Sequence, residues 1–447
     1  MAQDSFEGSV QEEIAVSPGL IVKKFIGILL SLFPLLTEAE ELDTLHHWRL
    51  EVSAMPGRAL VADKWQSEWL KDRNNMAFDA KVSFRKLPQD SDAFAKDYGY
   101  PTLSVGVRWQ MNHGVTMHKP LSNSWRYIEE VDYDSKMGNI ITLYGQFNRP
   151  VWQNNRWQVG YDLDFGVGYS HRKYNVENGI DNEMIGARWN IFFGMGANAS
   201  YRVGKNWGLT GGVQFYHHSN GAMNRPNKGA NFLSPYIGAF LLWDDDNRAE
   251  KRHTAKAISK NDKALKDDVS PFYLQFDLSV GTRTILEEWL YTQFEIRPEE
   301  EGYRKADFKN YITYSLQTGL MYRYARRWAS GIGTDICYGN YHKQLEKYNS
   351  YIGNEGKLSP WSVGIGIRHE AFYHRFSLAM SLGYYVYRNM GEWAKELEKP
   401  YYERIGLFYN IPGTKIKIGG QVKAHLIKAD LTEFTISIPL SFHSSPF

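Results

Sequence analysis

The sequence has very few of the residues that build metal clusters and disulfide frameworks. It contains one cysteine, Cys337, among 447 residues, which excludes an intramolecular disulfide and any metal site built from several cysteines. The charges nearly cancel, with 52 Lys+Arg against 50 Asp+Glu, so the composition does not favour nucleic acid as a partner. No apolar run reaches the roughly 20 residues that a transmembrane helix needs. If the protein spans a membrane, it must therefore do so with strands.

Aromatic residues, by contrast, are unusually frequent. They make up 15% of the chain, including 29 Tyr and 14 Trp, although the mean hydropathy is only −0.48. Amphipathic rings of this kind form girdles at the two water–lipid interfaces of outer-membrane β-barrels. The composition therefore favours a barrel over a soluble enzyme.

The first 39 residues have the features of a targeting segment. Lys23 and Lys24 precede an apolar stretch over residues 25–36, and Ala39 closes a small-residue exit. Two basic residues, an apolar core of about a dozen residues and a small-residue exit are the parts of a secretory signal peptide. We expect residues 1–39 to comprise an N-terminal extension and this signal.

After this segment, apolar and polar residues alternate with the period of two that is typical of strands. Apolar side chains occupy every second position from Trp157 to Val167, and again from Trp361 to Ile367. Half-buried strands of a soluble sandwich give the same alternation. The signal peptide, the aromatic content and strand lengths of about ten residues favour lipid-facing strands instead. We predict an all-β, antiparallel transmembrane β-barrel fold.

About sixteen such segments fall into two sets of eight, and bacterial barrels have even strand numbers. The first set begins near His47, Ala77, Pro101, Gly138, Arg156, Trp189, Asn206 and Phe232. The second set begins near Pro271, Asn310, Trp328, Pro360, His374, Tyr401, Thr414 and Thr432. Residues 244–270, rich in Asp, Lys and Arg, separate the sets as a charged linker. The expected units are therefore a barrel over 40–243 and a second, barrel-like repeat over 271–447.

The two sets share short sequence patterns that indicate a diverged repeat. Glu183-Met-Ile-Gly186 matches Glu403-Arg-Ile-Gly406, and a Gly-Gly pair precedes both His217 and His425 by the same spacing. The repeat favours two eight-stranded barrels. The alternative is one sixteen-stranded barrel.

One strand end carries residues with catalytic potential. Over Asn206–Asn220, the apolar side chains share one parity, and His217 and Ser219 continue it. Residues i and i+2 of a strand share a face, so the imidazole and hydroxyl can approach each other. A basic side chain on the lipid-facing side costs roughly 2–4 kcal/mol at the bilayer midplane but only about 0–1 near the interface. We therefore expect the pair at a membrane rim, at the extracellular end of the seventh strand.

The sequence His217-His-Ser-Asn-Gly221, followed by Arg225-Pro-Asn-Lys-Gly229, resembles the active-site signature of the lipid A 3-O-deacylases. The resemblance covers most of residues 47–243. It implies an eight-stranded outer-membrane barrel that removes an ester-linked acyl chain from lipopolysaccharide. It also implies that His217 is the general base, that Ser219 is the nucleophile, and that Asn227 helps hold the oxyanion, with Asn220 as a second candidate.

The sequence departs from this family at the third member of the catalytic triad. The family has a Glu twelve residues after the Ser, and here that position is Asn231. An Asn can orient a His, as in known variants of the triad. It cannot stabilise the imidazolium as an anion does, so a slower enzyme is one expected consequence.

The spacing of His217, Ser219 and Asn231 is also similar to that of outer-membrane phospholipase A, which uses a Ser-His-Asn triad and calcium. Phospholipid is therefore the main competing substrate. A non-enzymatic porin or structural barrel with a relic motif is the competing class. For the preferred reading we expect no cofactor and no metal site, lipopolysaccharide or outer-leaflet lipid as the partner, and the bacterial outer membrane as the location.

The second set lacks the catalytic pair. His425 stands where His217 would, but Ile427 replaces the serine. The apolar parity also differs, so His425 is expected to point into the barrel, with Glu433 as a potential partner. We predict an enzymatically inactive, degenerate copy.

Overall fold

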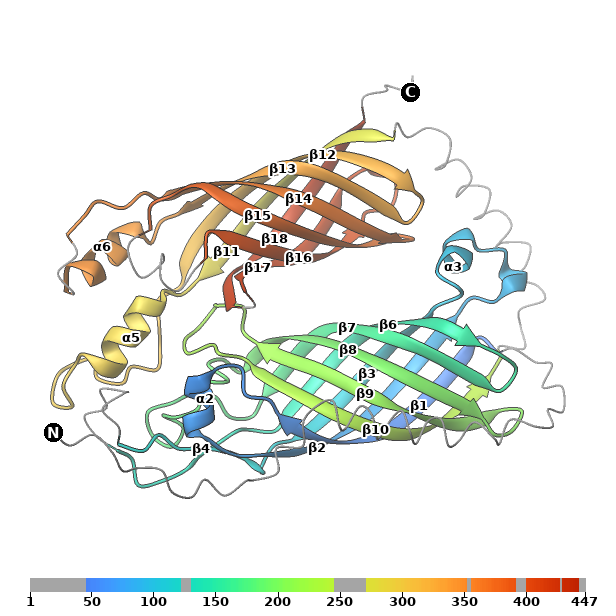
Figure 1. Ribbon diagram of the computed structural model, residues 1–447, viewed down its shortest axis with the longest axis horizontal. Helices are drawn as coiled ribbons and strands as arrows, with labels where there is room; N and C mark the ends of the chain where they lie inside the picture. Colours follow the sequence, from blue (N-terminus) through green and yellow to red (C-terminus); the bar gives the residue numbers. More distant parts are fainter. Residues whose placement is uncertain are drawn as a thin grey trace, which may run out of the picture. The chain divides into compact units, whose positions relative to one another are not determined.

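The computed structural model describes residues 46–121, 130–244, 271–351, 355–390, 399–426 and 428–441. The predicted signal peptide, nearly all of the predicted linker and Ile427 lie outside these ranges. Figure 1 shows two separate rings of strands, coloured blue to green for the first and yellow to red for the second. The prediction of an all-β fold with two barrels is confirmed.

The first barrel closes through its first and last strands, because β1 pairs antiparallel with both β2 and β10. Its eight strands are β1 (Trp48–Ala59), β2 (Leu70–Arg85), β3 (Thr102–Met111), β6 (Ile140–Gln153), β7 (Trp157–Ser170), β8 (Trp189–Arg202), β9 (Trp207–Ser219) and β10 (Ala230–Trp243). Two short strands, β4 (Val115–Met117) and β5 (Ser135–Lys136), extend the sheet beyond β2.

The second barrel closes independently, because β11 pairs with both β12 and β18. Its strands are β11 (Phe272–Arg283), β12 (Tyr311–Ala325), β13 (Trp328–Gly339), β14 (Trp361–Tyr373), β15 (Phe376–Arg388), β16 (Tyr401–Asn410), β17 (Lys417–His425) and β18 (Lys428–Ser441). The sixteen-stranded alternative is therefore wrong, since each set of eight satisfies its own edges.

Most strands begin close to the predicted positions, but β18 begins at Lys428 rather than near Thr432, and β2 differs more. It begins at Leu70 rather than near Ala77, and its first residues pair with β4 outside the barrel, through Leu70↔Met117 and Arg73↔Val115. The sequence there, Leu-Lys-Asp-Arg, is almost entirely polar. This segment has no apolar alternation because neither of its faces contacts lipid, which is why the pattern missed it.

The strands place apolar residues outside and polar residues inside. Val105 and Ile237 are 63% and 68% exposed on the outer surface, as lipid-facing residues of a barrel are. Inside the first barrel, Arg108 donates to Asp79 (2.9 Å) and to Gln214 (2.7 Å). An eight-stranded barrel has room for such side chains but not for an aqueous channel, so the filled interior disfavours the porin alternative.

The two ends of the first barrel differ in the length of their connections. The loops over residues 60–69, 112–139, 171–188 and 220–229 join strands at one end, whereas the other end has two tight turns, residues 154–156 and 203–206, and one longer connection, residues 86–101. Outer-membrane barrels have long extracellular loops and short periplasmic turns. The end of β9 that carries Ser219 is therefore the extracellular end.

Short helices occupy several connections. They are α2 (Lys64–Trp69) and α3 (Ala93–Asp97) in the first barrel, and α5 (Leu286–Phe294) and α6 (His342–Tyr351) in the second. Among the residues that the structure describes, no helix is both long and apolar enough to cross a membrane.

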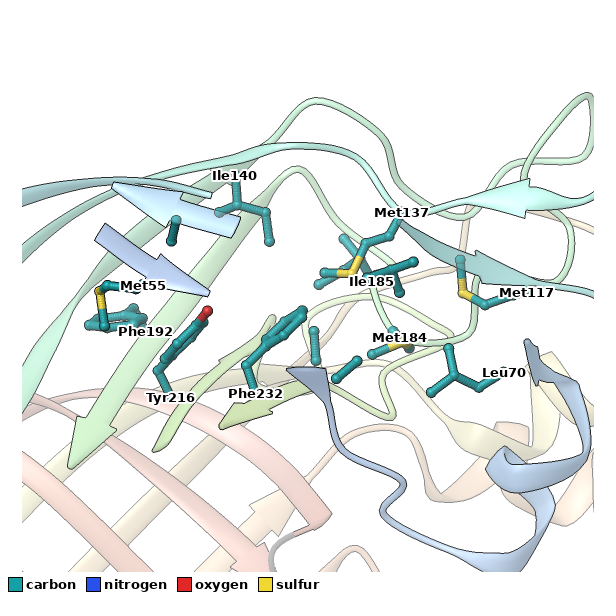
Figure 2. Close-up of a cluster of buried hydrophobic side chains, with 14 of the residues drawn as sticks. Met55, Leu70, Met117, Met137, Ile140, Met184, Ile185, Phe192, Tyr216 and Phe232 are labelled. Atoms are coloured by element: carbon teal, nitrogen blue, oxygen red, sulfur yellow. The ribbon is translucent and has the colours of Figure 1, made fainter. Parts of the chain in front are cut away.

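A buried hydrophobic cluster closes the extracellular mouth of the first barrel. Figure 2 shows Met184 and Ile185 of the β7–β8 loop between Phe232 of the barrel wall and Met117 of β4, all in one buried cluster that includes Tyr216. The rings of Tyr216 and Phe232 stack with centroids 5.2 Å apart. Because these two residues alternate with outward-facing neighbours on β9 and β10, their packing fixes the register of the two strands at the site described next.

Candidate active site

The extracellular end of β9 presents its residues to the two faces as the sequence predicted. His218 is fully buried in the barrel interior, where its Nε2 lies 2.9 Å from the Thr142 hydroxyl. His217 and Ser219 have the opposite parity and are half-buried on the outer face. The strand geometry therefore brings an imidazole and a hydroxyl to the same outer face, two residues apart.

The neighbouring strand supplies the partner of His217. Asn231 of β10 lies directly opposite His217 in the strand register, and Asn231 Oδ1 is 2.7 Å from His217 Nδ1. Because the amide oxygen can only accept, Nδ1 carries the proton and Nε2 keeps its lone pair. The structure thus brings together His217 and Asn231, two of the three residues predicted for the triad.

Ser219 is placed on this face by the strand rather than by a hydrogen bond. Within the described ranges, its hydroxyl forms no hydrogen bond with His217 or with another residue. Nucleophile–base contacts are often long without substrate and tighten when it binds.

The loop after Ser219 is tightly turned. Gly221 and Ala222 both have positive φ angles, +60° and +66°, a conformation that glycine adopts freely but an L-residue such as Ala222 adopts rarely. The Met223 amide donates to the Asn220 carbonyl oxygen (3.1 Å). In the described part of the chain, the Gly221 and Ala222 amides have no hydrogen-bond acceptor. Successive amides in such a turn form a concave site suited to an anion.

The two asparagines predicted for the oxyanion have different positions. Asn220 is fully buried, and its side-chain oxygen accepts from the Asn224 amide (3.2 Å). Asn227 is half-buried, and its Oδ1 accepts from the Asn220 amide (3.0 Å), which leaves its Nδ2 hydrogens available. This arrangement favours Asn227 over Asn220 as a donor to substrate, and gives Asn220 a role in shaping the loop.

Gly229 is a positioning residue that the sequence reasoning missed. Its φ is +77°, and a Cβ atom there would lie 2.4 Å from Cε1 of His217. Only glycine fits both the left-handed conformation and the close approach to the ring. The signal was present, because Gly229 ends the Arg-Pro-Asn-Lys-Gly segment.

A buried ionic cluster holds the same loop from inside the barrel mouth. Glu183, in the β7–β8 loop, pairs with Lys119 and, at 3.5 Å, with Lys228. The Lys228 amide also donates to the Glu183 carbonyl oxygen (3.1 Å). Burial alone would raise the pKa of Glu183, but the two lysines hold that pKa below its usual value. The cluster therefore ties the loop to the barrel mouth with a carboxylate that stays charged.

No group of three or more His, Cys, Asp and Glu residues could hold a metal ion among the residues that the structure describes. In the second barrel, His425 ends β17 and is 2% exposed in the interior, where its Nε2 lies 3.1 Å from the Tyr385 hydroxyl. The predicted inward orientation of His425 is confirmed. Its suggested pairing with Glu433 is wrong, because Glu433 instead pairs with Arg404 and accepts from Gln421.

Comparison with known families matches each barrel separately. Residues 102–239 match the model of the family described as "Lipid A 3-O-deacylase (PagL)", and residues 272–443 match the model described as "Acyloxyacyl hydrolase, C-terminal domain". No curated protein sequence matches the chain.

Two solved structures match part of the chain. The "Crystal structure of the outer membrane enzyme PagL" is 14% identical, covers 42% of this chain and 97% of its own, and has a TM-score of 0.27. A structure from "De novo design of transmembrane beta-barrels" is 17% identical, covers 43% and 93% of the two chains, and has a TM-score of 0.19. At these values the structural matches carry no argument about function, which depends on the family matches and on the site.

Proposed function

We propose that this chain, whose residues 102–239 match the lipid A 3-O-deacylase family and whose residues 272–443 match the acyloxyacyl hydrolase C-terminal domain, removes an ester-linked acyl chain from lipid A in the bacterial outer membrane, with Ser219 as nucleophile. The observation that carries the mechanism is the 2.7 Å contact between His217 Nδ1 and Asn231 Oδ1. It leaves Nε2 as the proton acceptor, on the same face of β9 as Ser219.

The reaction follows from this protonation state. His217 Nε2 takes the proton from the Ser219 hydroxyl while its oxygen attacks the ester carbonyl carbon, and the carbonyl oxygen becomes an oxyanion. The Asn227 amide, with backbone amides of the following turn, stabilises that charge. The imidazolium then protonates the leaving alcohol of the sugar. Water, deprotonated by the same histidine, releases the fatty acid and restores Ser219.

Asn231 differs from an acidic triad member in one respect. Its oxygen fixes the tautomer and orientation of His217, but it carries no full negative charge to stabilise the imidazolium. We therefore expect an active enzyme with a lower kcat than an otherwise equal enzyme with Glu at this position.

The surroundings of the pair fit a substrate with acyl chains. In the strand register, Ile191 and Phe193 of β8 lie opposite Ser219 and His217, and Phe215 continues the same outer face of β9. The site thus lies at the extracellular rim with apolar side chains beside it, where the acyl part of an outer-leaflet lipid would contact them. An ester near the headgroup would then reach Ser219.

The main alternative is a phospholipase, and one observation favours it. The His217–Asn231 contact is that of a Ser-His-Asn triad, which the lipid A deacylase signature does not have. In that case calcium would be needed, and phospholipid rather than lipopolysaccharide would be cleaved.

The test is mass spectrometry of lipopolysaccharide and, separately, of phospholipid after incubation with the purified protein. We expect loss of one acyl chain from lipid A, and no loss with Ser219→Ala. The matched control is Ser330→Ala in the second barrel, because Ser330 Oγ lies 2.9 Å from His369 Nδ1 on the outer face. This control should keep full activity. Lysophospholipid, formed only with calcium, would reassign the substrate, and no product from either lipid would contradict an enzymatic function.

A further inference from the structure

The loop that follows Ser219 is held by residues of the second barrel. The Gly221 carbonyl oxygen accepts from the Thr432 hydroxyl (2.8 Å). The Ala222 carbonyl oxygen accepts from both the amide (2.8 Å) and the hydroxyl (2.9 Å) of Thr284. In return, Arg225 donates through Nη2 to the Thr284 carbonyl oxygen (3.1 Å). These bonds join the start of the β9–β10 loop to the end of β11 and to β18.

The contact is close, and its two halves differ in burial. Ala222 and Thr284 are both fully buried, whereas Thr432 is half-buried. A Cβ atom on Gly221 would lie 2.0 Å from the Thr432 hydroxyl oxygen, so only glycine allows this approach. The bonds between Ala222 and Thr284 are shielded from water, so solvent cannot replace them when one partner is removed.

The bonded carbonyl groups fix the directions of particular amides. In a trans peptide unit the C=O and the following N–H point in opposite directions within one plane. The Thr432 hydroxyl therefore orients the Ala222 N–H, and Thr284 orients the Met223 N–H. The Met223 amide is already bonded to Asn220, whereas the Ala222 amide has no acceptor among the described residues.

We infer that the second barrel is a positioning element for the active site: Thr432 holds the peptide unit whose Ala222 N–H is available to the oxyanion, and Thr284 holds the adjoining unit, whose Met223 N–H is bonded to Asn220. The inference rests on the proposed function for its catalytic consequence. The bracing itself does not depend on that function. This role explains how a barrel without a catalytic pair contributes to the reaction, since donors to an oxyanion act only when they are fixed in advance.

The two threonines should differ in importance. Thr432 is the hydrogen-bond partner of Gly221 O, so Thr432→Val removes that support entirely. Thr284→Val removes only the hydroxyl, because the backbone amide of residue 284 still donates to Ala222 O. We expect Thr432→Val to lower kcat about threefold to tenfold and Thr284→Val by less, with KM changed by less than about twofold. Thr432→Ser, which keeps the hydroxyl, should have the kcat of the wild-type protein.

Two measurements on the full chain test the inference. The first is kcat and KM for lipid A deacylation by wild type, Thr432→Val, Thr432→Ser and the control Thr318→Val. Thr318 bonds to Thr334 on the outer face of the second barrel (2.7 Å), so its loss should leave kcat unchanged. The second is hydrogen–deuterium exchange of the loop amides, which should become faster in Thr432→Val only.

The outcomes separate this inference from the proposed function. Faster loop exchange with a lower kcat in Thr432→Val, both reversed in Thr432→Ser, supports the bracing role. Unchanged exchange and unchanged kcat in a folded Thr432→Val overturn it. A wild-type protein that deacylates no lipid A counts against the proposed function, and the exchange measurement then still decides whether the second barrel holds the loop.

Discussion

The seventh strands of the two barrels, β9 and β17, share a sequence pattern but differ in what they present to the membrane. Each strand runs toward the end of its barrel at which most of the long connections lie. In each strand, a Gly-Gly pair precedes the histidine by five residues. His217 is half-buried on the outer face, whereas His425 is 2% exposed in the interior. A shift of one residue moves every side chain of a strand to the other face. The parity of the strand, and not the local motif, therefore decides which histidine can meet a lipid.

The connections after the two strands differ as well. Residues 220–229 follow β9, while only residues 426 and 427 separate β17 from β18. The longer loop supplies Asn227 and Gly229 beside His217, and the short turn has no room for equivalents. The comparison shows that the site depends on a strand end and a loop together, so a histidine on the strand is not sufficient.

The largest expected effect comes from replacing each of the two histidines in turn. His217→Ala should lower kcat for lipid A at least about 1000-fold, because it removes the proposed general base. His425→Ala should leave kcat within about twofold of wild type, since His425 lies in the other barrel's interior. Both variants are compared by mass spectrometry of lipid A. Equal losses in the two variants, with both proteins folded, would contradict the assignment of His217.

Substitution of Asn231 should have a smaller effect on kcat. Two different substitutions should change kcat in opposite directions. Asn231→Ala should lower kcat about tenfold to 100-fold, because His217 loses the acceptor that fixes its tautomer. Asn231→Glu should raise kcat about tenfold at neutral pH, because a carboxylate stabilises the imidazolium. Steady-state kinetics on lipid A measure both changes.

The control for the added charge is Asn410→Glu at the end of β16, a strand of the second barrel, which should change nothing. A gain in phospholipid cleavage alone for Asn231→Glu would indicate that lipid A is not the substrate. A loss for Asn231→Glu on both lipids would mean that the site requires the neutral amide.

The sequence alone was sufficient to predict the barrels because their strands contact lipid on one face and packed polar groups on the other. From the resulting alternation, the sequence predicted correctly that His217 and Ser219 face outward and that His425 faces the barrel interior. The extension of β2 was missed because neither of its faces meets lipid. Likewise, the Glu-x-Ile-Gly repeat proved misleading, since Glu183 lies in a loop before β8 and Glu403 lies within β16.

The contacts that hold the site could not be predicted in this way. Long-range pairs such as Thr432 with Gly221, 211 residues apart, leave no periodic trace in a single sequence. The buried cluster of Lys119, Glu183 and Lys228 joins three separate loops, and loop residues follow no period that reports their partners. Only Gly229 was marked locally, by its place in the motif.

The smallest expected effect concerns acid stability and tests whether Glu183 and Glu403 are equivalent. The ion pairs with Lys119 and Lys228 hold the pKa of Glu183 below its ordinary value of 4.5, against the effect of burial. A carboxyl with a lowered pKa stabilises the fold above its unfolded pKa, and this stabilisation is lost as pH falls through the folded pKa. The thermal midpoint of the wild-type protein should therefore decrease as the pH is lowered below about 4.5.

Substituting the two glutamates sharpens this prediction. Glu183→Gln leaves Lys119 buried beside a neutral amide, and breaking a buried ion pair costs about 3–5 kcal/mol. The variant should therefore have a lower midpoint at pH 6 and a smaller further loss between pH 6 and pH 3. Glu403 is half-buried on the outward face of β16, so Glu403→Gln should lower the midpoint at pH 6 by less than Glu183→Gln does. If the thermal midpoints of wild type and Glu183→Gln change with pH in parallel, the cluster does not hold the loop through its charges. Deacylation measured at pH 6 would then identify any role that the loop keeps without them.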